Sequence, residues 1–392
     1  MKIACVVHRF GTDIAGGSEA HCRAIAEHLA QRHDVTVLTT SARDHVTWHN
    51  DYESGTGRSG PLTVKRFPVL RPRSMHRFAE ISEVVFTGKA SEDEQERWFK
   101  ENGPESPALL DHLRRHGAEY DRVLFWAFRY ATTYFGLPIV ADRAVLLPTA
   151  EEDPVMRIDL LERFFGLPKG LAFLTPEEAE LVARRRSGPL PPSCVIGCGI
   201  EPPTAQPPVE GLAGIGVERP FVLYLGRIDP NKGCEALVAD FTRYHAEEGG
   251  GVSLVMAGPA NMPIPRGPAF KILGFVSDDV REALLAHAAV LVVPSLFESL
   301  SMVLLEAWNH GVPVLVNGRC AVLKGQVTRA NGGLYYRSYD EFSRGLRRLL
   351  GTAAEGENSI ARGLGRQGQA YVEREYRWPK VMGTLEAFLE GL

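Results

Sequence analysis

Short apolar segments alternate with longer segments of helical periodicity along the whole sequence. This alternation is typical of parallel α/β proteins, in which a helix connects each buried strand to the next. A helix is expected at residues 16–32, and Thr175 followed by Pro176 and two glutamates predicts the start of another. The pattern predicts strands at residues 3–7, 35–39, 62–67, 123–126, 145–147, 171–174 and 194–196, and in a second series at 221–225, 253–257, 271–273, 290–293 and 312–315.

Residues 201–219 separate the two series. Their proline-rich sequence cannot continue a helix or a central strand, and it predicts a linker with polyproline tendency. A chain of 392 residues also exceeds what a single hydrophobic core usually organises. We therefore expect one α/β domain over residues 1–200 and a second that begins at residue 220.

Composition and charge limit the classes of partner. Hydrophobic residues make up 44% and charged residues 23%, and the formal charge of −4 gives no general attraction to nucleic acid. Six scattered cysteines in a long chain predict reduced thiols, and Cys194 and Cys198 have no neighbouring Cys/His pair to complete a zinc site. We find neither a signal peptide nor an apolar run near the roughly 20 residues that cross a bilayer, so a cytoplasmic protein is expected.

Gly16 and Gly17 lie between the first predicted strand and its helix. Glycines allow a ligand to approach the backbone closely, and the free N–H groups at a helix N-terminus suit a phosphate. A tight turn in which Ser18 caps the helix explains the same residues, so both interpretations stay open.

Arg227 and Lys232 follow the first strand of the second series, within the segment Gly226–Gly233. The planar guanidinium and the compact ammonium both suit a diphosphate. Open α/β sheets bind ligands at the carboxyl ends of their strands, and this position favours a binding role over a solvated loop.

Two carboxylates, Glu298 and Glu306, follow the strand predicted at 290–293. Glu298 is expected at the mouth of the loop and Glu306 two turns into the following helix, whose N-terminus lies between them. At 1.5 Å per residue the two carboxylates would be roughly 12 Å apart along the axis, which is too far for an acid–base couple but suits the two ends of a sugar–diphosphate–ribose. The N-terminus of that helix would bind the phosphates. Glu306 lies among apolar residues, where an unpaired charge is unfavourable, so it either binds hydroxyl groups or faces solvent.

In this order and spacing, the motifs resemble those of the family-4 glycosyltransferases of the GT-B fold. The resemblance covers nearly the whole chain and is strongest from Phe221 to Val316. The Gly-Arg-x4-Lys-Gly element and the Glu-x7-Glu element followed by Gly-x-Pro-Val are together highly specific. The family fold implies two Rossmann-like, doubly wound domains that face a central cleft. Residues 1–200 would bind the acceptor, residues 220–377 would bind the nucleotide sugar, and a last helix at about 378–392 would pack back on the first domain.

The resemblance also implies a function: retaining, metal-independent and cofactor-free transfer of a hexose-type sugar from a UDP- or GDP-sugar to a small-molecule, lipid or saccharide acceptor. The cations would neutralise the departing diphosphate, Glu306 would bind the ribose, and Glu298 would lie beside the transferred sugar. Catalytic roles are implied for Arg227, Lys232, Glu298 and the position of Glu151. Donor-binding roles are implied for Gly16, Gly17, Phe275, Val276, Ser299, Leu300, Ser301 and Glu306.

Glu151 departs from the family pattern, because many members have a histidine after the preceding Pro-Thr-Ala. An ionised carboxylate only accepts hydrogen bonds, so the change indicates a different sugar, a cationic acceptor or lost activity. In the last case the chain would be a nucleotide-sugar-binding protein. Phe128 and Tyr130 replace a His-x-His-like stretch, and they either stack on an acceptor or belong to the core.

Other classes fit the sequence less well. A GT-B epimerase would lack the Glu-x7-Glu arrangement, and a dehydrogenase would need a Gly-x-Gly-x-x-Gly motif after the first strand, which is missing. The basic segment at residues 65–77 is either a solvated loop or a surface that contacts anionic membranes or acidic acceptors. The nucleobase, the acceptor and the oligomeric state do not follow from the sequence.

Overall fold

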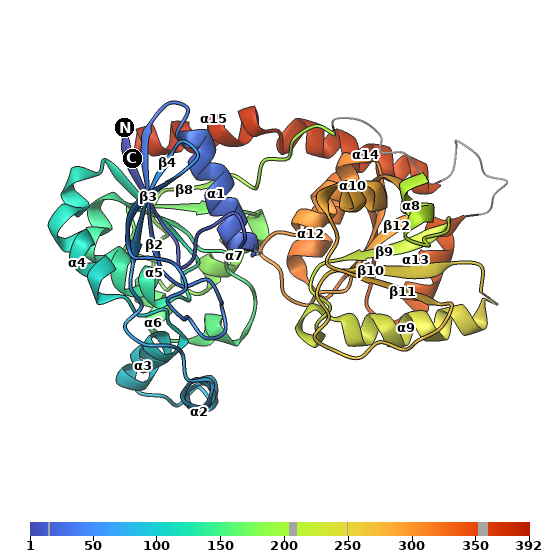
Figure 1. Ribbon diagram of the computed structural model, residues 1–392, viewed down its shortest axis with the longest axis horizontal. Helices are drawn as coiled ribbons and strands as arrows, with labels where there is room; N and C mark the ends of the chain where they lie inside the picture. The colour runs from blue at the N-terminus through green and yellow to red at the C-terminus, as the bar shows by residue number, and fades with distance from the viewer. Residues whose placement is uncertain (15, 204–209, 249, 352–359) are drawn as a thin grey trace. The chain divides into compact units, whose positions relative to one another are not determined.

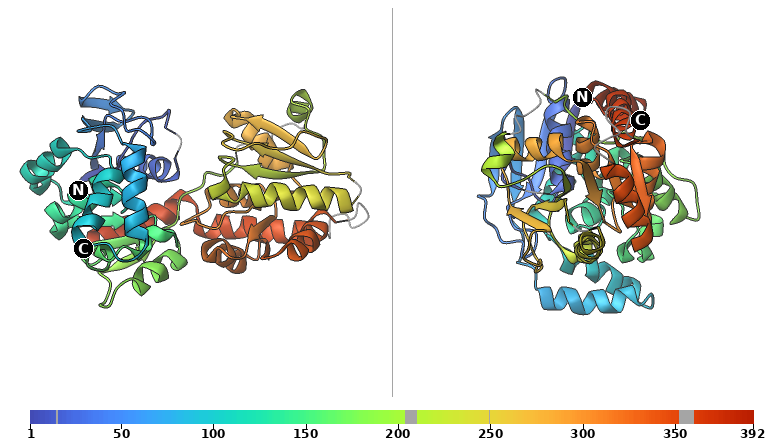
Figure 2. Two further views of the ribbon diagram at one scale, coloured as in Figure 1. Left: turned by 90° about the horizontal axis from the view of Figure 1, so that it is seen from below. Right: turned by 90° about the vertical axis from the view of Figure 1, so that its right-hand side faces the viewer.

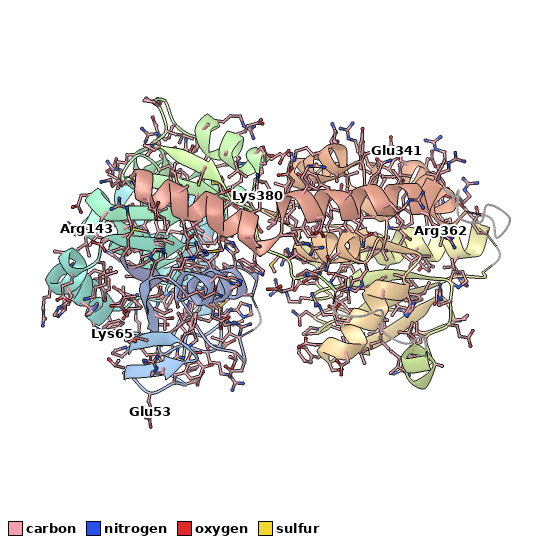
Figure 3. The ribbon with its side chains drawn as sticks, turned by 90° about the horizontal axis from the view of Figure 1, so that it is seen from above. Glu53, Lys65, Arg143, Glu341, Arg362 and Lys380 are labelled. Carbon is pink, nitrogen blue, oxygen red and sulfur yellow. The ribbon has the colours of Figure 1, made fainter. Side chains whose placement is uncertain are left out.

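The computed structural model describes residues 1–14, 16–203, 210–248, 250–351 and 360–392, which form two compact units (Figure 1). Unit 1 comprises Met1–Cys198 and Val381–Leu392, and unit 2 comprises Gly199–Lys380. The last helix, α15 (Trp378–Gly391), begins in unit 2 and ends in unit 1, and Lys380, labelled in Figure 3, is the last residue of unit 2. No helix in the described part of the chain is long and apolar enough to cross a membrane.

Unit 1 is built on an eight-stranded sheet with the order β3-β4-β2-β1-β5-β6-β7-β8. All neighbouring strands are parallel except the edge pair β3–β4. The strands are β1 (Lys2–Val6), β2 (Asp34–Thr40), β3 (Gly55–Ser59), β4 (Leu62–Phe67), β5 (Arg122–Trp126), β6 (Ala144–Leu147), β7 (Gly170–Phe173) and β8 (Ser193–Val195). The helices are α1 (Gly17–Leu29), α2 (Met75–Phe86), α3 (Glu92–Asn102), α4 (Pro107–His116), α5 (Ala131–Gly136), α6 (Leu160–Phe164), α7 (Pro176–Arg184) and the short 3₁₀ helices η1 (Gly117–Glu119), η2 (Leu137–Arg143) and η3 (Pro154–Arg157).

Unit 2 is built on a six-stranded parallel sheet with the order β11-β10-β9-β12-β13-β14. Its strands are β9 (Phe221–Leu225), β10 (Ser253–Ala257), β11 (Phe270–Gly274), β12 (Val290–Val293), β13 (Val314–Asn317) and β14 (Gly333–Tyr336). Its helices are α8 (Glu210–Gly214), η4 (Pro230–Lys232), α9 (Cys234–Glu247), α10 (Asp278–His287), α11 (Met302–Asn309), α12 (Ala321–Ala330), α13 (Tyr339–Leu350) and α14 (Ile360–Glu375). Helices cover both faces of the sheet in each unit (Figure 2).

Each sheet has a point at which the strand order reverses. In unit 1 the reversal lies between β1 and β5, and in unit 2 it lies between β9 and β12. The loops that leave the carboxyl ends of two such strands diverge, because their helices pack on opposite faces of the sheet. These two reversal points are therefore the places in the fold at which a ligand is expected.

The predicted α/β fold class is confirmed, and four predicted strands, β4, β9, β10 and β12, have the observed bounds. The strand predicted at 312–315 begins later, at Val314, because Pro313 has no N–H group for the ladder. The edge strands β3 and β14 were not predicted. β3 has the sequence Gly-Thr-Gly-Arg-Ser, which lacks any apolar position, and it exists through its antiparallel pairing with β4.

The predicted linker at 201–219 belongs to unit 2, and it contains the short helix α8. Residues 204–209 of this segment lie outside the described part of the chain. The division into units falls at residues 198 and 380, close to the domain limits predicted at 200 and 377.

The packing of α14 on α11 depends on glycines. The indole N–H of Trp308 on α11 donates to the carbonyl oxygen of Gly332 at 2.8 Å. On α14, a Cβ atom at Gly365 would collide with the carbonyl oxygen of Gly311, whereas a Cβ atom at Gly363 would meet nothing within 4 Å. The two glycines thus differ in environment although they lie on the same helix.

The substitution Gly365→Ala is expected to lower the free energy of unfolding of unit 2 by about 1–3 kcal/mol, because backbone must shift to accept the methyl group. Gly363→Ala is the matched control, and it should raise the same free energy by up to about 1 kcal/mol through helix propensity. Differential scanning calorimetry of both variants measures the effect. Equal stability of the two variants would contradict this account of the helix packing.

Candidate active site

The segment Gly226–Gly233 leaves β9 at the strand-order reversal of unit 2. Asp229 caps the short helix η4 by accepting a hydrogen bond from the backbone N–H of Asn231 at 2.9 Å. Gly233 has a left-handed backbone (φ +75°), and a Cβ atom there would collide with the carbonyl oxygen of Pro294. Only glycine readily adopts this backbone conformation and also leaves room for the Pro294 carbonyl. Gly233 therefore allows the loop after β9 to contact the loop after β12.

Lys232 and Glu298 meet at this contact. The Nζ atom of Lys232 lies 2.9 Å from Oε1 of Glu298, and the two side chains expose 32% and 13% of their surface. The residues come from loops that follow the neighbouring parallel strands β9 and β12. The structure therefore brings together two residues that the sequence singled out separately.

Arg227 lies on the same loop and is more exposed. Its Nε atom is 3.7 Å from Oδ2 of Asp229, and 42% of its side chain is exposed. The carboxyl end of β9 thus carries a guanidinium and an ammonium within six residues of sequence. Two cations at the reversal point of a sheet suit an anionic ligand.

Glu298 lies in the loop before α11 and Glu306 lies on the helix, so the helix N-terminus falls between the two residues, as the sequence predicted. Helix α11 begins only at Met302, after an extended residue, Ser301. Ser299, Leu300 and Ser301 lie in the loop before the helix, and Leu300 and Ser301 are buried. The N-terminus of α11 follows this loop, as the sequence implied.

Glu306 lies on α11 with 17% of its side chain exposed, and it forms an ion pair with Arg281 of α10. The sequence interpretation that it merely faces solvent is therefore not what the structure shows. Arg281 was not singled out from the sequence, since the pair joins two helices and has no local pattern.

Phe275 and Val276 follow β11. The side chain of Phe275 is 82% exposed, while Val276 is half-buried. Gly274 at the end of the strand has φ +67°, which turns the chain at this point. A large exposed ring beside a strand end is available for stacking on a planar ligand.

In unit 1, Gly16 occupies the N-cap position of α1 with an extended backbone. The alternative in which Ser18 caps the helix is wrong, because its hydroxyl donates to Oε2 of Glu19 at 2.8 Å. A Cβ atom at Gly16 would collide with the Glu19 carboxylate, whereas a Cβ atom at Gly17 would meet nothing within 4 Å. The backbone at Gly17 is therefore open to a close approach.

A buried charged cluster beside this turn was missed by sequence reasoning. His8, Arg9 and Glu19 are all nearly inaccessible to solvent. His8 Nε2 lies 3.0 Å from Oε1 of Glu19, and the guanidinium of Arg9 contacts the same oxygen. Burial alone would raise the pKa of Glu19, but His8 and Arg9 hold it well below its usual range.

The structure separates the two candidate acceptor residues. Phe128 is fully buried in the core of unit 1 and packs against Phe165, which is the core alternative that the sequence left open. Tyr130 is half-buried, and its ring stacks on His8 with a centroid distance of 3.7 Å. Only Tyr130 thus adjoins the charged cluster at the reversal point.

Arg129, in the loop after β5, forms ion pairs with Glu151 and Asp153, which both lie in the loop after β6. Its guanidinium lies 3.7 Å from the Glu151 carboxylate and 3.0 Å from that of Asp153. The loops leave β5 and β6 through Ala127 (φ 59°) and Thr149 (φ 49°), which are left-handed conformations that non-glycine residues rarely adopt. Such strained backbone tends to occur at functional sites, where the surrounding structure holds it in place.

Glu178 holds the loop that contains Glu151 through a hydrogen bond to its backbone. Its buried carboxylate accepts hydrogen bonds from the backbone N–H of Ala150 at 2.7 Å and of Leu174 at 2.6 Å. The helix signal that contains it is confirmed, because Thr175 caps α7 and Pro176 is its first residue. Burial raises the pKa of Glu178 to about 8, although both backbone donors favour the ionised form.

The basic segment at 65–77 is largely paired within unit 1. Arg71 and Arg77 contact the carboxylate of Glu101 at 2.9 and 3.2 Å. The Arg66 guanidinium donates to the carbonyl oxygen of Phe10 at 2.7 Å. These contacts account for much of the positive charge that the sequence showed.

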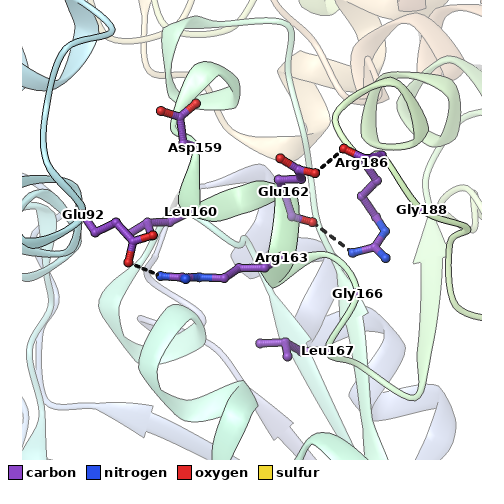
Figure 4. Close-up of a pocket in the computed structure, with 10 residues that line it drawn as sticks. Glu92, Asp159, Leu160, Glu162, Arg163, Gly166, Leu167, Arg186 and Gly188 are labelled. Atoms are coloured by element: carbon purple, nitrogen blue, oxygen red, sulfur yellow. Dashed lines mark hydrogen bonds and ion pairs between the residues drawn. The ribbon is translucent and has the colours of Figure 1, made fainter.

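The structure also contains two pockets that the predicted site residues do not line. One, of about 570 Å³, lies between the N-terminus of α3, α6 and the segment after α7 (Figure 4), where Arg163 pairs with Glu92 at 2.8 Å and Arg186 donates to the carbonyl oxygen of Glu162 at 2.9 Å. The other, of about 450 Å³, is lined by Arg9, Asp13, Ile14, Arg43, Asp44 and Asp51. Within the described ranges, no group of three or more His, Cys, Asp or Glu side chains is arranged to hold a metal ion.

Part of the chain matches a known protein family. Residues 219–352 match the family described as "Glycosyl transferases group 1". The chain is 31% identical over 150 residues to "Uncharacterized glycosyltransferase MJ1607" of Methanocaldococcus jannaschii, a match that covers 35% of this chain and 37% of the relative. The chain thus spans little more than a third of that relative's length.

Solved structures match over the whole chain. Sucrose-phosphate synthase of Thermosynechococcus elongatus superposes with a TM-score of 0.72 at 17% identity, covering 100% of this chain and 98% of that one. Anabaena Alr3699/HepE, crystallised with UDP, superposes with a TM-score of 0.66 at 15% identity and covers 100% of both chains. The fold is therefore that of the GT-B glycosyltransferases, as the sequence motifs implied.

The segment that matches this family, residues 219–352, contains Arg227, Lys232, Glu298 and Glu306. It begins just before β9 and so includes both loops at the strand-order reversal of unit 2.

The titration of Glu178 provides a test of the loop support. The folded protein holds this proton more tightly than the unfolded chain, so its contribution to stability falls as the pH rises from about 4.5 to about 8. Relative to Glu178→Gln, which cannot titrate, the wild-type protein should lose about 2–4 kcal/mol of unfolding free energy in unit 1 between pH 5 and pH 9. Hydrogen exchange of peptides from α7 at both pH values measures this difference, and parallel pH profiles for the two proteins would exclude the assignment.

Proposed function

We propose that this chain is a glycosyltransferase that moves a hexose-type sugar from a UDP- or GDP-sugar to a small-molecule, lipid or saccharide acceptor. The observation that carries the proposal is the meeting of Lys232 and Glu298, beside Arg227, at the strand-order reversal of unit 2. That reversal lies in the segment that matches a glycosyltransferase family.

The proposed reaction follows from the charges at this position. Breaking the bond between the anomeric carbon and the diphosphate oxygen leaves negative charge on the diphosphate. Arg227, Lys232 and the first N–H groups of α11 would stabilise this charge. Without donor, Lys232 is held by Glu298; with donor, the ammonium would face the diphosphate and the carboxylate would accept hydrogen bonds from sugar hydroxyls.

We further propose that the transfer retains the anomeric configuration and uses no metal ion or cofactor. The acceptor oxygen would bond to the anomeric carbon on the face that the diphosphate leaves, and the acceptor proton would pass to a phosphate oxygen. Two side-chain cations and a helix N-terminus supply the positive charge that a metal would otherwise provide. UDP is the first nucleotide to test, because the structurally similar HepE was crystallised with it.

Glu151 supports a second candidate function. In the family that the sequence resembles, many members have a histidine at this position, and here Arg129 and Asp153 form a charged group with Glu151. If this group does not promote transfer, the protein would bind nucleotide sugars without reacting them. Slow donor hydrolysis by the pure protein favours the transferase, whereas tight binding without hydrolysis or transfer favours the binding protein.

A thermal-shift screen with UDP, GDP and their sugar conjugates should identify the donor. A ligand that binds only the folded protein raises its melting temperature, and a concentration of 100 times Kd corresponds to about 2.7 kcal/mol of stabilisation. Wild-type protein that is stabilised by none of these compounds would remove the proposed function.

Lys232→Ala should lower kcat by about 10²–10³-fold, because the departing diphosphate loses a preorganised charge. Because the substitution also removes the ion-pair partner of Glu298, the melting temperature of the variant is compared with that of the wild-type protein. Lys89→Ala is the control, because Lys89 is an exposed lysine of unit 1. Transfer or donor hydrolysis at the wild-type rate in Lys232→Ala would refute the diphosphate assignment.

Glu306→Gln should raise the donor KM by about tenfold and change kcat less, since the proposed ribose contact is present in both ground and transition states. Steady-state kinetics with varied donor concentration measures the split. An unchanged KM would show that Glu306 has only a structural role.

A further inference from the structure

Arg281 of α10 is placed to act on Glu306. Its guanidinium forms an ion pair with Oε2 of Glu306, and the two side chains expose 31% and 17% of their surface. The oxygen that faces Arg281, Oε2, is buried, and apart from this ion pair it has no hydrogen-bond partner in the described part of the chain. One oxygen of the carboxylate is thus held and the other remains able to accept.

The two helices also have contacts other than this ion pair. His310, at the end of α11, bonds through Nε2 to Oε2 of Glu282 on α10 at 2.7 Å. The buried residues of α10 and α11 also contribute to the hydrophobic core of unit 2.

Glu306 without a cation would be unsuited to a nucleotide. It lies between the buried residues Leu305 and Ala307, where an unpaired charge is unfavourable, and it would repel the negative charge of a nucleoside diphosphate. An arginine neutralises the carboxylate and, because its guanidinium is planar and rigid, also limits the rotation of the carboxylate. Both effects prepare the free oxygen for a hydroxyl group.

We propose that Arg281 is a positioning residue for the nucleotide ribose: it fixes Glu306 so that Oε1 accepts hydrogen bonds from the ribose hydroxyls. This rests on the proposed function, in which Glu306 faces the ribose. Arg281 acts through Glu306, so its removal reduces recognition of the hydroxyl groups more than it reduces attraction to the diphosphate.

Isothermal titration with UDP and with 2′,3′-dideoxy-UDP tests this role in the full chain. The wild-type protein should bind UDP about tenfold more tightly than the dideoxy compound, which is the discrimination expected of about 1.4 kcal/mol. In Arg281→Ala the affinity for UDP should fall about five- to tenfold and the preference should fall to less than about twofold. Arg281→Gln, which keeps much of the side-chain length but not the charge, should show the same loss and guards against a folding defect in the alanine variant.

Arg243→Ala is the matched control. It removes the same side chain and a similar ion pair, with Glu247 at 2.8 Å, from the last turns of α9, away from the end of that helix that follows β9. Its affinity for both compounds should stay within about twofold of wild type.

The proposal is overturned if Arg281→Ala and Arg281→Gln bind UDP as tightly as wild type, or if UDP and the dideoxy compound weaken by the same factor. The second outcome would mean that Arg281 only attracts the diphosphate. Failure of the wild-type protein to bind UDP or GDP at all is a different result, and it would remove the proposed function itself.

Discussion

Gly233 packs directly on the carbonyl oxygen of Pro294, and this contact determines where the charges of unit 2 lie. It joins the loop after β9 to the loop after β12 without any intervening side chain. Lys232 is the residue before Gly233, and Glu298 is four residues after Pro294, so both residues lie close in sequence to this backbone contact. Parallel pairing places β9 and β12 side by side, and the left-handed backbone of Gly233 allows their two loops to touch.

A second property of the molecule follows from its partly buried charges, which are paired with one another. Lys232 pairs with Glu298, Arg281 with Glu306, and Arg129 with Glu151 and Asp153. Unpaired charges at these depths would be expensive, and removal of one partner leaves that penalty on the other. A ligand of unit 2 that brings its own charges and hydroxyl groups would therefore exchange partners with Lys232–Glu298 and Arg281–Glu306, which are already paired. These charges are therefore held in place in the absence of a ligand.

The sequence predicted the parts of the fold that depend on local pattern. Buried parallel strands such as β9 and β12 are continuous apolar runs, and the cap of α7 is a local signal. The strand β3 was not predicted because its residues have no apolar pattern, and the strand forms by pairing with β4. The Glu-x7-Glu spacing identified Glu298 and Glu306, and the helix starts between them as predicted. Other contacts join residues that are distant in sequence, so no sequence periodicity could predict them. These are the ion pair of Arg281, the cluster around Glu19 and the hydrogen bonds of Glu178.

The sequence of the edge strand β3 affects how copies of the protein can contact one another. It forms the outer edge of the sheet of unit 1, next to β4, and its residues Gly-Thr-Gly-Arg-Ser are mostly exposed. An exposed strand edge offers unpaired backbone groups to any neighbouring chain, and apolar side chains would make such an addition favourable. Here two glycines and an arginine give an incoming strand no apolar surface to cover. The edge therefore resists the strand-to-strand aggregation to which open parallel sheets are prone.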